Sequence, residues 1–149
     1  MRTLQDLRTV VGSARRHDAR VRRVTGISGS QLWALDEVAH LAGITVKELA
    51  ARLALHQTTA SNLINALVER HLIRRARDRR DQRVVHLYVT AEGARLLARS
   101  PRPCSGLLVD ALRQIAARDL DRLARSLATL LGKMHQASPA AAGEILLGE

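Results

Sequence analysis

Aromatic residues and cysteine are nearly absent from this chain of 149 residues, which has no Phe, one Trp, one Tyr and one Cys. The lone Cys104 excludes a disulfide within the chain and is typical of a reducing compartment. Because aromatic rings are so few, the core must consist of Leu, Val, Ile and Ala, a composition that favours helices. A mainly helical fold with an aliphatic core is expected.

Long apolar runs and catalytic motifs are missing as well. No stretch approaches the roughly 20 apolar residues of a transmembrane helix, and the charged start of the chain is unlike a signal peptide. The six histidines are scattered singly, and the sequence has no phosphate-binding glycine loop and no nucleophile elbow. We therefore expect one domain over residues 1–149, located in the cytoplasm, with no cofactor, no metal, no membrane partner and no enzymatic activity.

Acidic residues are also few, because 14 Asp and Glu stand against 24 Lys and Arg and leave a net charge of +10. Only Lys47 and Lys133 are lysines. Such a chain attracts polyanions, and Arg suits contacts to phosphate and guanine better than Lys does. The charge favours a nucleic-acid or anionic-membrane partner. Codon usage in a GC-rich genome would explain the preference for Arg equally well, but not the positive balance.

Apolar residues at helical spacing predict two amphipathic helices at the start of the chain. The first runs through residues 4–24 and ends before a glycine. Ser28 or Ser30 can cap the second, which Gly43 would end in a left-handed conformation.

A third and a fourth helix follow with the pattern of a helix-turn-helix. Thr45 and Glu48 have the spacing of a capping box, and an apolar stripe follows over residues 46–53. After a break at residues 54–56, residues 57–73 carry an apolar face and a polar face. Since Ser, Thr and Asn are mediocre helix formers, we interpret the polar face as a surface for phosphates and base edges in the major groove. A solvated helix start with no partner is the alternative. The candidate DNA-binding residues here are Thr45, Gln57, Thr58, Thr59, Ser61, Asn62 and Asn65.

Two β-rich runs, residues 73–76 and 84–89, enclose a charged tip and predict a hairpin. Its candidate DNA-binding residues are Arg74, Arg75, Arg77, Arg79, Arg80 and Arg83. A guanidinium at the tip can enter a narrow minor groove, while those nearer the base can bind phosphates. We predict that Asp78 and Asp81 accept hydrogen bonds in the turn and orient the arginines. In an isolated hairpin, such a charge run would more often be a solvated edge that prevents aggregation.

Three segments in this order, TVKELAARL, TTASNLINALVERHLIRR and DRRDQRVVHLYVTAEG, resemble the MarR (multiple-antibiotic-resistance regulator) family of winged helix-turn-helix transcription factors. The most specific part is an Asp-x-x-Asp-x-Arg core before a strand and a Thr-x-x-Gly helix start, here Thr90–Gly93. The resemblance covers residues 30–97. Ala54 and His71 depart from it, because the family commonly has Gly at both positions.

The resemblance implies a mainly α fold with a small β-wing, in which a winged helix-turn-helix is flanked by N- and C-terminal dimerisation helices. We assign the DNA-binding lobe to residues 30–97 and the dimerisation helices to residues 1–25 and 105–136. Independently of the resemblance, a long helix starting near Leu108 has Leu and Met at heptad-like steps, and its apolar stripe needs a partner. A homodimer is expected, with two recognition helices about 34 Å apart on a pseudo-palindrome. Residues 137–149 are expected to form a flexible tail.

The resemblance further implies an effector, a small aromatic or phenolic anion held between the dimerisation helices and the DNA-binding lobe. By position, His17, Arg20, Trp33 and His40 are the candidate pocket residues. Since the chain has so few aromatic rings, an aliphatic pocket of weak selectivity is an equal alternative. A Trp in an amphipathic helix is also more often part of the core than of a ligand site.

We therefore expect a sequence-specific transcriptional regulator, a repressor that binds double-stranded DNA and is released by a small molecule. A non-specific architectural nucleic-acid binder is the first alternative, and it would show no sequence preference. A protein-interaction module with degenerate DNA contacts is a second. A redox-sensing regulator is a third, because Arg102 close to Cys104 can lower the pKa of its thiol; a plain structural thiol is the simpler interpretation.

Overall fold

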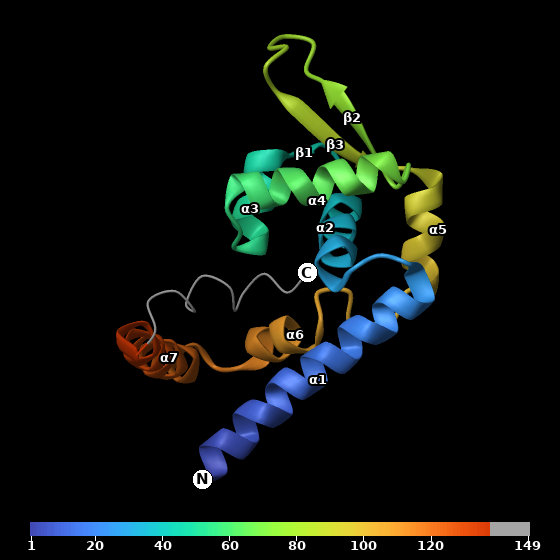
Figure 1. The fold of residues 1–149 in the computed structure, drawn as a ribbon. Helices are drawn as coiled ribbons and strands as arrows, with labels where there is room; N and C mark the ends of the chain where they lie inside the picture. Colours follow the sequence, from blue (N-terminus) through green and yellow to red (C-terminus); the bar gives the residue numbers. More distant parts are fainter. Residues whose placement is uncertain (138–149) are drawn as a thin grey trace. The chain divides into compact units, whose positions relative to one another are not determined.

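The structure is a computed structural model that describes residues 1–137, and the chain divides into two compact units, residues 1–110 and residues from 111 onward. Apart from Ala137, the expected tail at residues 137–149 lies outside the described residues. In order, the elements are α1 (Arg2–Thr25), α2 (Gly29–His40), β1 (Ile44–Thr45), α3 (Val46–Leu53), α4 (Gln57–Glu69), β2 (Ile73–Arg77), β3 (Val85–Val89), α5 (Ala91–Arg99), α6 (Leu107–Gln114) and α7 (Ala117–Ala137) (Figure 1). The predicted fold class, mainly α with a small β-wing, is confirmed. No helix of the described part is long and apolar enough to cross a membrane.

The sheet of the first unit is antiparallel, with strand order β1-β3-β2. The central strand β3 pairs on one side with β1, Ile44 facing Leu87, and on the other with β2, from the pair Ile73–Val89 to the pair Arg77–Val85. Beyond β1, the β2–β3 hairpin extends as the wing, and α4 runs across its base (Figure 1).

The core lies between this sheet and helices α2, α3 and α4, with Val21 of α1 and Leu96 and Leu97 of α5 added to it, and it is aliphatic as expected. Its largest fully buried side chains include Leu32, Leu35, Leu49, Ile64, Leu67 and Leu87. Trp33 is only partly buried and packs against the edge of this cluster. The lobe therefore needs no aromatic centre, because aliphatic side chains fill the space between one small sheet and the helices around it.

Local capping explains where these helices begin. Ser28 caps α2 and Thr45 caps α3, each in a reciprocal capping box with the residue three positions later. Thr90 caps α5, where its Oγ1 accepts from the Gly93 amide at 3.0 Å. The predicted capping box at Thr45 and the predicted helix start at Thr90 are thus confirmed.

Glycine ends α1 as predicted, but the prediction for the end of α2 is wrong. Gly26 takes a left-handed conformation, with a φ of 73°, directly after α1. Helix α2 already ends at His40, and Gly43, with a φ of 86°, lies further on, in the turn into β1. The positive φ favours glycine here, and a Cβ would also lie 3.3 Å from the Tyr88 hydroxyl, so that side chain would have to shift slightly.

Ala54 and His71, which replace the family's usual glycines, still adopt its left-handed turns, with φ values of 54° and 58°. After α3, the Leu55 amide donates to the Ala50 carbonyl at 2.9 Å; after α4, the Leu72 amide donates to the Leu67 carbonyl, also at 2.9 Å. These bonds close Schellman-type helix ends. The hydrogen bonds and the buried neighbours thus hold two residues with a Cβ in a conformation that normally suits glycine.

In the C-terminal part, the prediction of a single long helix is wrong. The segment that starts near Leu108 forms α6, which ends at Gln114, and α7 begins anew at Ala117. The apolar stripe of α7 is present, yet Ala117 to Gln136 contains no buried residue. Its exposed large apolar residues are Leu120, Leu123, Leu127, Leu130, Leu131 and Met134.

Candidate nucleic-acid interface

Helix α4 buries its apolar face and exposes its polar one. Ala60, Ile64 and Leu67 are completely buried. Among the sequence-predicted residues, Gln57, Thr58, Asn62 and Asn65 are exposed, and Thr59 and Ser61 are half-buried. His56 precedes the helix without a side-chain cap bond, so the first turn is not closed by a cap side chain. An exposed helix start with uncapped amide groups attracts anions such as phosphate.

The wing tip is held together by two carboxylates. Asp78 Oδ1 accepts hydrogen bonds from the amides of Arg80 and Asp81 at 2.7 and 3.0 Å, and Asp81 Oδ1 accepts from the Arg83 amide at 3.0 Å. Together with the backbone bonds from the Asp78 amide to the Val84 carbonyl and from the Val84 amide to the Asp81 carbonyl, these bonds give the tip one defined turn. By contrast, the contact between the Arg83 and Asp81 side chains is long, at 4.0 Å, and the Arg83 side chain is 96% exposed. The carboxylates order the backbone and leave the guanidinium free to reach outward.

Strand register separates the arginines of β2 into two faces. Arg75 lies opposite Leu87 and Arg77 opposite Val85, so both share the face of the hairpin that turns toward the core and α4. The Arg75 guanidinium donates to Asn65 Oδ1 on α4. Arg74 lies on the other face, where its guanidinium stacks 4.4 Å from the centre of the Tyr88 ring. The structure therefore does not bring Arg74 together with its two neighbours.

Two adjoining hollows lie where the wing meets α3 and α4. One, of about 330 Å³, is lined by Thr45, Val46, Lys47, Gln57, Arg83, Val84 and Val85. The other, of about 410 Å³, is lined by Val46, Arg75, Arg77 and Val85. Because Val46 and Val85 belong to both, the hollows form one groove, which we call the wing groove. Its floor is apolar and its rim is cationic.

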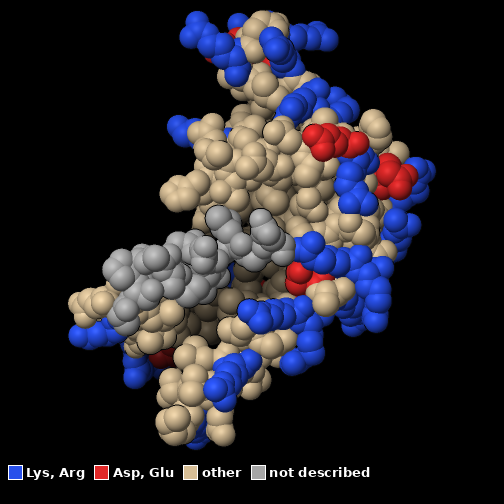
Figure 2. Space-filling model, in the orientation of Figure 1, with Lys and Arg blue, Asp and Glu red and all other residues tan. Residues whose placement is uncertain are grey.

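The wing groove contains predicted residues from three elements and one residue that the sequence analysis missed. Thr45, Gln57, Arg75, Arg77 and Arg83 all line it. The missed residue is Lys47, an exposed lysine in the first turn of α3. Its position two residues after Thr45, a capping residue already predicted to contact DNA, could have identified Lys47 from the sequence. Figure 2 shows that basic side chains also crowd the wing tip, where Arg79 and Arg80 are exposed.

A separate cationic hollow of about 300 Å³ lies beside α1. Ser13, Arg16, His17, Arg20, Arg102 and Leu107 line it. The predicted effector residues His17 and Arg20 thus lie together, but Trp33 and His40 are not among the lining residues. The Trp33 ring N–H donates to Glu37 at 3.1 Å, and the His40 Nδ1 atom lies 2.8 Å from the Asp36 carbonyl oxygen. Three arginines make this hollow suitable for an anion, and sequence reasoning missed Arg16 and Arg102.

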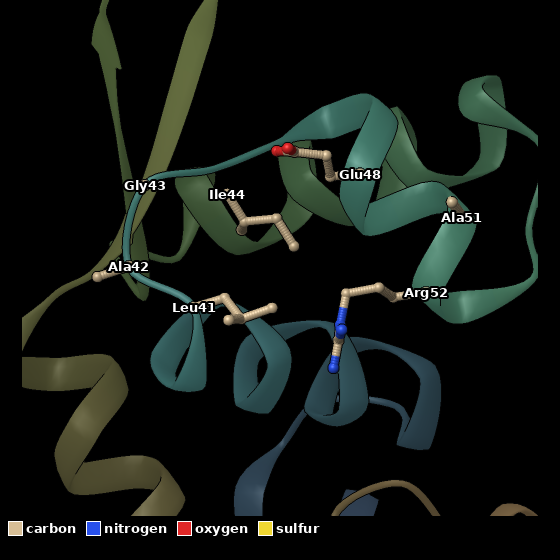
Figure 3. A pocket seen from close by; sticks show the side chains of 7 residues that line it. All are labelled: Leu41, Ala42, Gly43, Ile44, Glu48, Ala51 and Arg52. Carbon is tan, nitrogen blue, oxygen red and sulfur yellow. The ribbon is translucent and has the colours of Figure 1, made fainter.

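A further hollow, of about 510 Å³, lies between the α2–β1 turn and α3, lined by Leu41, Ala42, Gly43, Ile44, Glu48, Ala51 and Arg52 (Figure 3). Its charged side chains are engaged elsewhere. Arg52 Nε donates to the buried Glu37 at 2.6 Å, while Glu48 accepts from the Thr45 amide and hydroxyl at 2.8 and 2.7 Å. The bonds from Thr45 hold the pKa of Glu48 below its ordinary value. Both charges therefore stabilise the fold, and we assign no ligand to this hollow.

Cys104 is buried rather than placed in an open linker. Burial, reinforced by the negative charge of Asp36, raises the pKa of its thiol to about 11. Arg102 lies close, with its Nη1 3.0 Å from the sulfur, but it also lies 3.4 Å from Asp36 Oδ1, and its effect on the thiol does not prevail. The argument for a redox sensor rested on a thiol pKa lowered by Arg102, and this geometry works against it, because the pKa is raised. Within residues 1–137, no group of His, Cys, Asp and Glu side chains could hold a metal ion.

Comparison with known sequences supports the expectation drawn from the wing signature. Residues 25–84 match the MarR family. Over this segment, the winged helix of the chain resembles that of MarR-family proteins. The matched segment contains α2, β1, α3, α4, β2 and the wing tip, and so all the residues that line the wing groove except Val85 of β3. No curated protein matches the sequence of the chain.

Several solved structures show the same fold at low sequence identity. The Staphylococcus aureus MepR–DNA complex matches with a TM-score of 0.62 and 18% identity, over 90% of this chain and 98% of MepR. Streptococcus pneumoniae FabT in complex with DNA matches with a TM-score of 0.60 and 18% identity, over 92% of this chain and 98% of FabT. BldR, a transcriptional regulator from Sulfolobus solfataricus, matches with a TM-score of 0.58 and 21% identity, over 89% and 96% of the two chains. At these identities the likeness shows the fold.

Proposed function

We propose that this chain is a DNA-binding transcriptional repressor of the MarR type that holds a pseudo-palindromic operator as a homodimer and is released by a small anion. The wing groove carries the proposal. It joins the polar start of α4, the first turn of α3 and the wing arginines around one concave, cationic surface. A concave row of cations beside an exposed polar helix suits a phosphate backbone next to a readable groove. An operator reader works where the chromosome is, so a cytoplasmic location is part of the proposal.

In this proposal, α4 enters the major groove and the wing contacts the neighbouring minor groove. Gln57, Thr58, Thr59, Ser61 and Asn62 probe base edges and phosphates, since Gln and Asn can pair with adenine through two hydrogen bonds. Arg79, Arg80 and Arg83 engage the minor groove and its phosphates. Lys47, Arg75 and Arg77, on the rim of the wing groove, neutralise the phosphates between the two grooves. MepR and FabT, which share the fold, were both solved with DNA, and this supports the assignment.

Exposed apolar stripes on the terminal helices support the homodimer. In α1, the large apolar residues Leu4, Leu7, Val10 and Val11 are between 37% and 49% exposed. In α7, a stripe of Leu and Met is exposed to the same degree. Surfaces of this kind on an isolated chain mark association sites. A two-fold dimer formed by residues 1–25 and 105–136 would cover both stripes and present two DNA-binding lobes, residues 30–97, to one face of a duplex.

The hollow beside α1 supports release by an anion. Arg16, His17, Arg20 and Arg102 surround it, and guanidinium groups bind carboxylates through paired hydrogen bonds. It lies next to the segment that we assign to dimerisation, so an occupant can change how the lobes are held. Disturbing the two-site fit by about 3 kcal/mol would weaken binding more than 100-fold. An aromatic or phenolic carboxylate is the proposed class of effector.

The decisive experiment is selection of bound sequences from random duplex DNA by the purified protein, at about 150 mM salt to weaken non-specific phosphate binding. Enrichment of an inverted repeat with half-sites about one helical turn apart would support the dimeric operator reader. Tight, salt-sensitive binding without enrichment would support the non-specific binder instead. Retention of a protein partner by a chain that does not bind DNA would support the interaction module. The enriched sequence then serves to screen aryl carboxylates for release.

A further inference from the structure

His86 connects the wing to the helix-turn-helix. It lies on the central strand β3, opposite Thr45 of β1 on one side and opposite Ala76 of β2 on the other. Its side chain is only 27% exposed. This position places the imidazole between two parts of the interface that are distant in sequence, the segment that leads into α3 and the hairpin that forms the wing.

Both ring nitrogens of His86 face oxygen atoms that can only accept hydrogen bonds. Nδ1 lies 2.7 Å from the Gly43 carbonyl oxygen, and Nε2 lies 3.3 Å from Asp78 Oδ2. A neutral imidazole carries one N–H and can donate to one of these atoms, whereas the imidazolium donates to both. Deprotonation therefore leaves a lone pair facing either a carbonyl or a carboxylate oxygen. The arrangement is complete only when His86 is charged.

The charges around His86 favour the same form. Asp78 of the wing turn and Glu48 of α3 are the acidic groups that act on it, and burial opposes them. On the same face of the hairpin lie Arg74 and Tyr88, stacked on each other. The Gly43 carbonyl, followed by the Asp78 carboxylate, raises the pKa of His86 above 6.5. The amides of Asp81 and Arg80, followed by the bond from His86, lower the pKa of Asp78. Both shifts favour the charged forms of the two side chains.

Asp78 passes this contact on to the wing tip. Its Oδ1 atom accepts from the amides of Arg80 and Asp81, so Oδ2 is the atom that remains for His86. At the other end, the Gly43 amide donates to the Leu87 carbonyl at 2.9 Å, and Thr45, two residues later, caps α3. One imidazolium therefore bridges the turn that presents the tip arginines and the turn that precedes α3.

We propose that His86 is a positioning residue that holds the wing in its DNA-binding geometry only as the imidazolium, so that operator affinity falls as the pH rises through its titration. The proposal rests on the proposed function, because it assigns a regulator of the same DNA interface. His86 itself need not touch DNA. It acts through Asp78 on the tip and through Gly43 on the start of α3.

The sign follows from linkage. The charged form gains hydrogen bonds on folding, so the contribution of His86 is complete below the ordinary pKa of 6.5 and is lost as the pH rises through the higher pKa of the folded protein. If only the protonated fraction is competent, apparent affinity falls with that fraction, up to about tenfold for each pH unit above the pKa. Wing order in the free protein should follow the same curve.

The test measures affinity for the selected operator at constant ionic strength, between about pH 5.5 and about pH 8.5, a range that brackets the usual pKa values of histidine. Wild type is compared with His86→Gln and with His40→Gln, a matched loss of a histidine that lies outside the wing. We expect wild type and His40→Gln to lose affinity over this range, and His86→Gln to bind weakly with little slope. Equal slopes for wild type and His86→Gln would overturn the proposal.

Two further measurements keep the test independent of DNA binding and of folding defects in one variant. Asp78→Asn retains an amide oxygen for the turn but removes the carboxylate that faces His86, and it should reduce the slope in the same way. In the free protein, NMR should show the His86 ring titrating above its ordinary pKa, with the amides of Arg79 and Arg80 shifting on the same curve. The positioning role is refuted, even if operator binding is confirmed, if the His86 ring titrates at or below 6.5 or if the chemical shifts of the tip amides do not follow its titration. If selection finds no operator, this NMR result still decides whether His86 orders the wing.

Discussion

Arg75 on β2 donates a hydrogen bond to Asn65 on α4, so the wing and the helix that we assign to the major groove meet through two side chains. This pair crosses the junction between the two parts of the DNA-binding lobe. It restrains an arginine that would otherwise lose more side-chain entropy on meeting a phosphate. The wing groove is thus partly organised within the chain itself.

Replacing Arg75 with Ala should weaken operator binding and lower the slope of log affinity against log salt by about one, as expected for the loss of one phosphate contact. Arg74→Ala is the matched control, because it removes the same charge from the opposite face of the same strand. Titrations at several salt concentrations measure both. Equal losses in the two variants would mean that net charge, rather than the wing groove, governs binding.

Gly93→Ala should destabilise the lobe. A Cβ at this position would lie 2.2 Å from the Leu72 backbone oxygen, and backbone cannot yield as a flexible side chain can. Thr90 donates to that same oxygen through its amide at 3.0 Å, so α5 has no room to retreat without breaking this contact. We expect a cost of about 1–3 kcal/mol. Gly132→Ala is the control, since nothing lies within 4 Å of its added Cβ, and it should be neutral or stabilising by about 0.5–1 kcal/mol. Thermal unfolding of both variants checks the contrast.

Leu127→Glu should convert the proposed dimer to a monomer. Operator affinity should fall by about 100-fold or more, because the two DNA-binding lobes would then bind their half-sites independently. The lobe itself should keep its thermal stability, since α7 contributes no buried residue between Ala117 and Gln136. Arg125→Glu, on the polar side of the same helix, introduces a carboxylate outside the stripe and should leave the mass unchanged. Sedimentation equilibrium gives the mass of each variant. A monomeric wild type would remove the dimer from the proposal.

The Cys104 thiol should be unreactive in the native protein. Burial raises its pKa to about 11, so little thiolate exists at neutral pH. We expect slow labelling of the native protein by a maleimide at about pH 7.5, and fast labelling after unfolding. Operator binding should survive mild peroxide treatment. Rapid native labelling together with loss of binding on oxidation would revive the redox-sensing alternative.

Local signals in the sequence were enough to predict most of the fold. The capping boxes, the apolar stripes and the wing signature all act over a few residues, so they can be identified without knowledge of the folded chain. The break between α6 and α7 was missed because the apolar spacing continues across it, with Ile115 keeping the stripe. Periodicity alone does not reveal where a helix stops and starts again.

The candidate site was predictable as a set of residues but not as an arrangement. Which arginines of β2 face α4 depends on the register with β3, and one step of register moves every side chain to the other face. Trp33 and His40 were grouped with His17 by position in the sequence, yet the packing of α1 and α2 places them outside the hollow that His17 lines.

The sequence by itself determined that this chain is a basic, aliphatic-cored protein with a capped helix-turn-helix and an arginine-rich hairpin, because composition and short-range patterns carry that information. Only the tertiary structure decided that Lys47 joins the wing groove, that Cys104 is buried and that His86 bridges Gly43 and Asp78. The reason is physical: burial and the meeting of side chains from distant segments depend on how strands pair and helices pack, and no local pattern encodes a contact between residues 43 and 86.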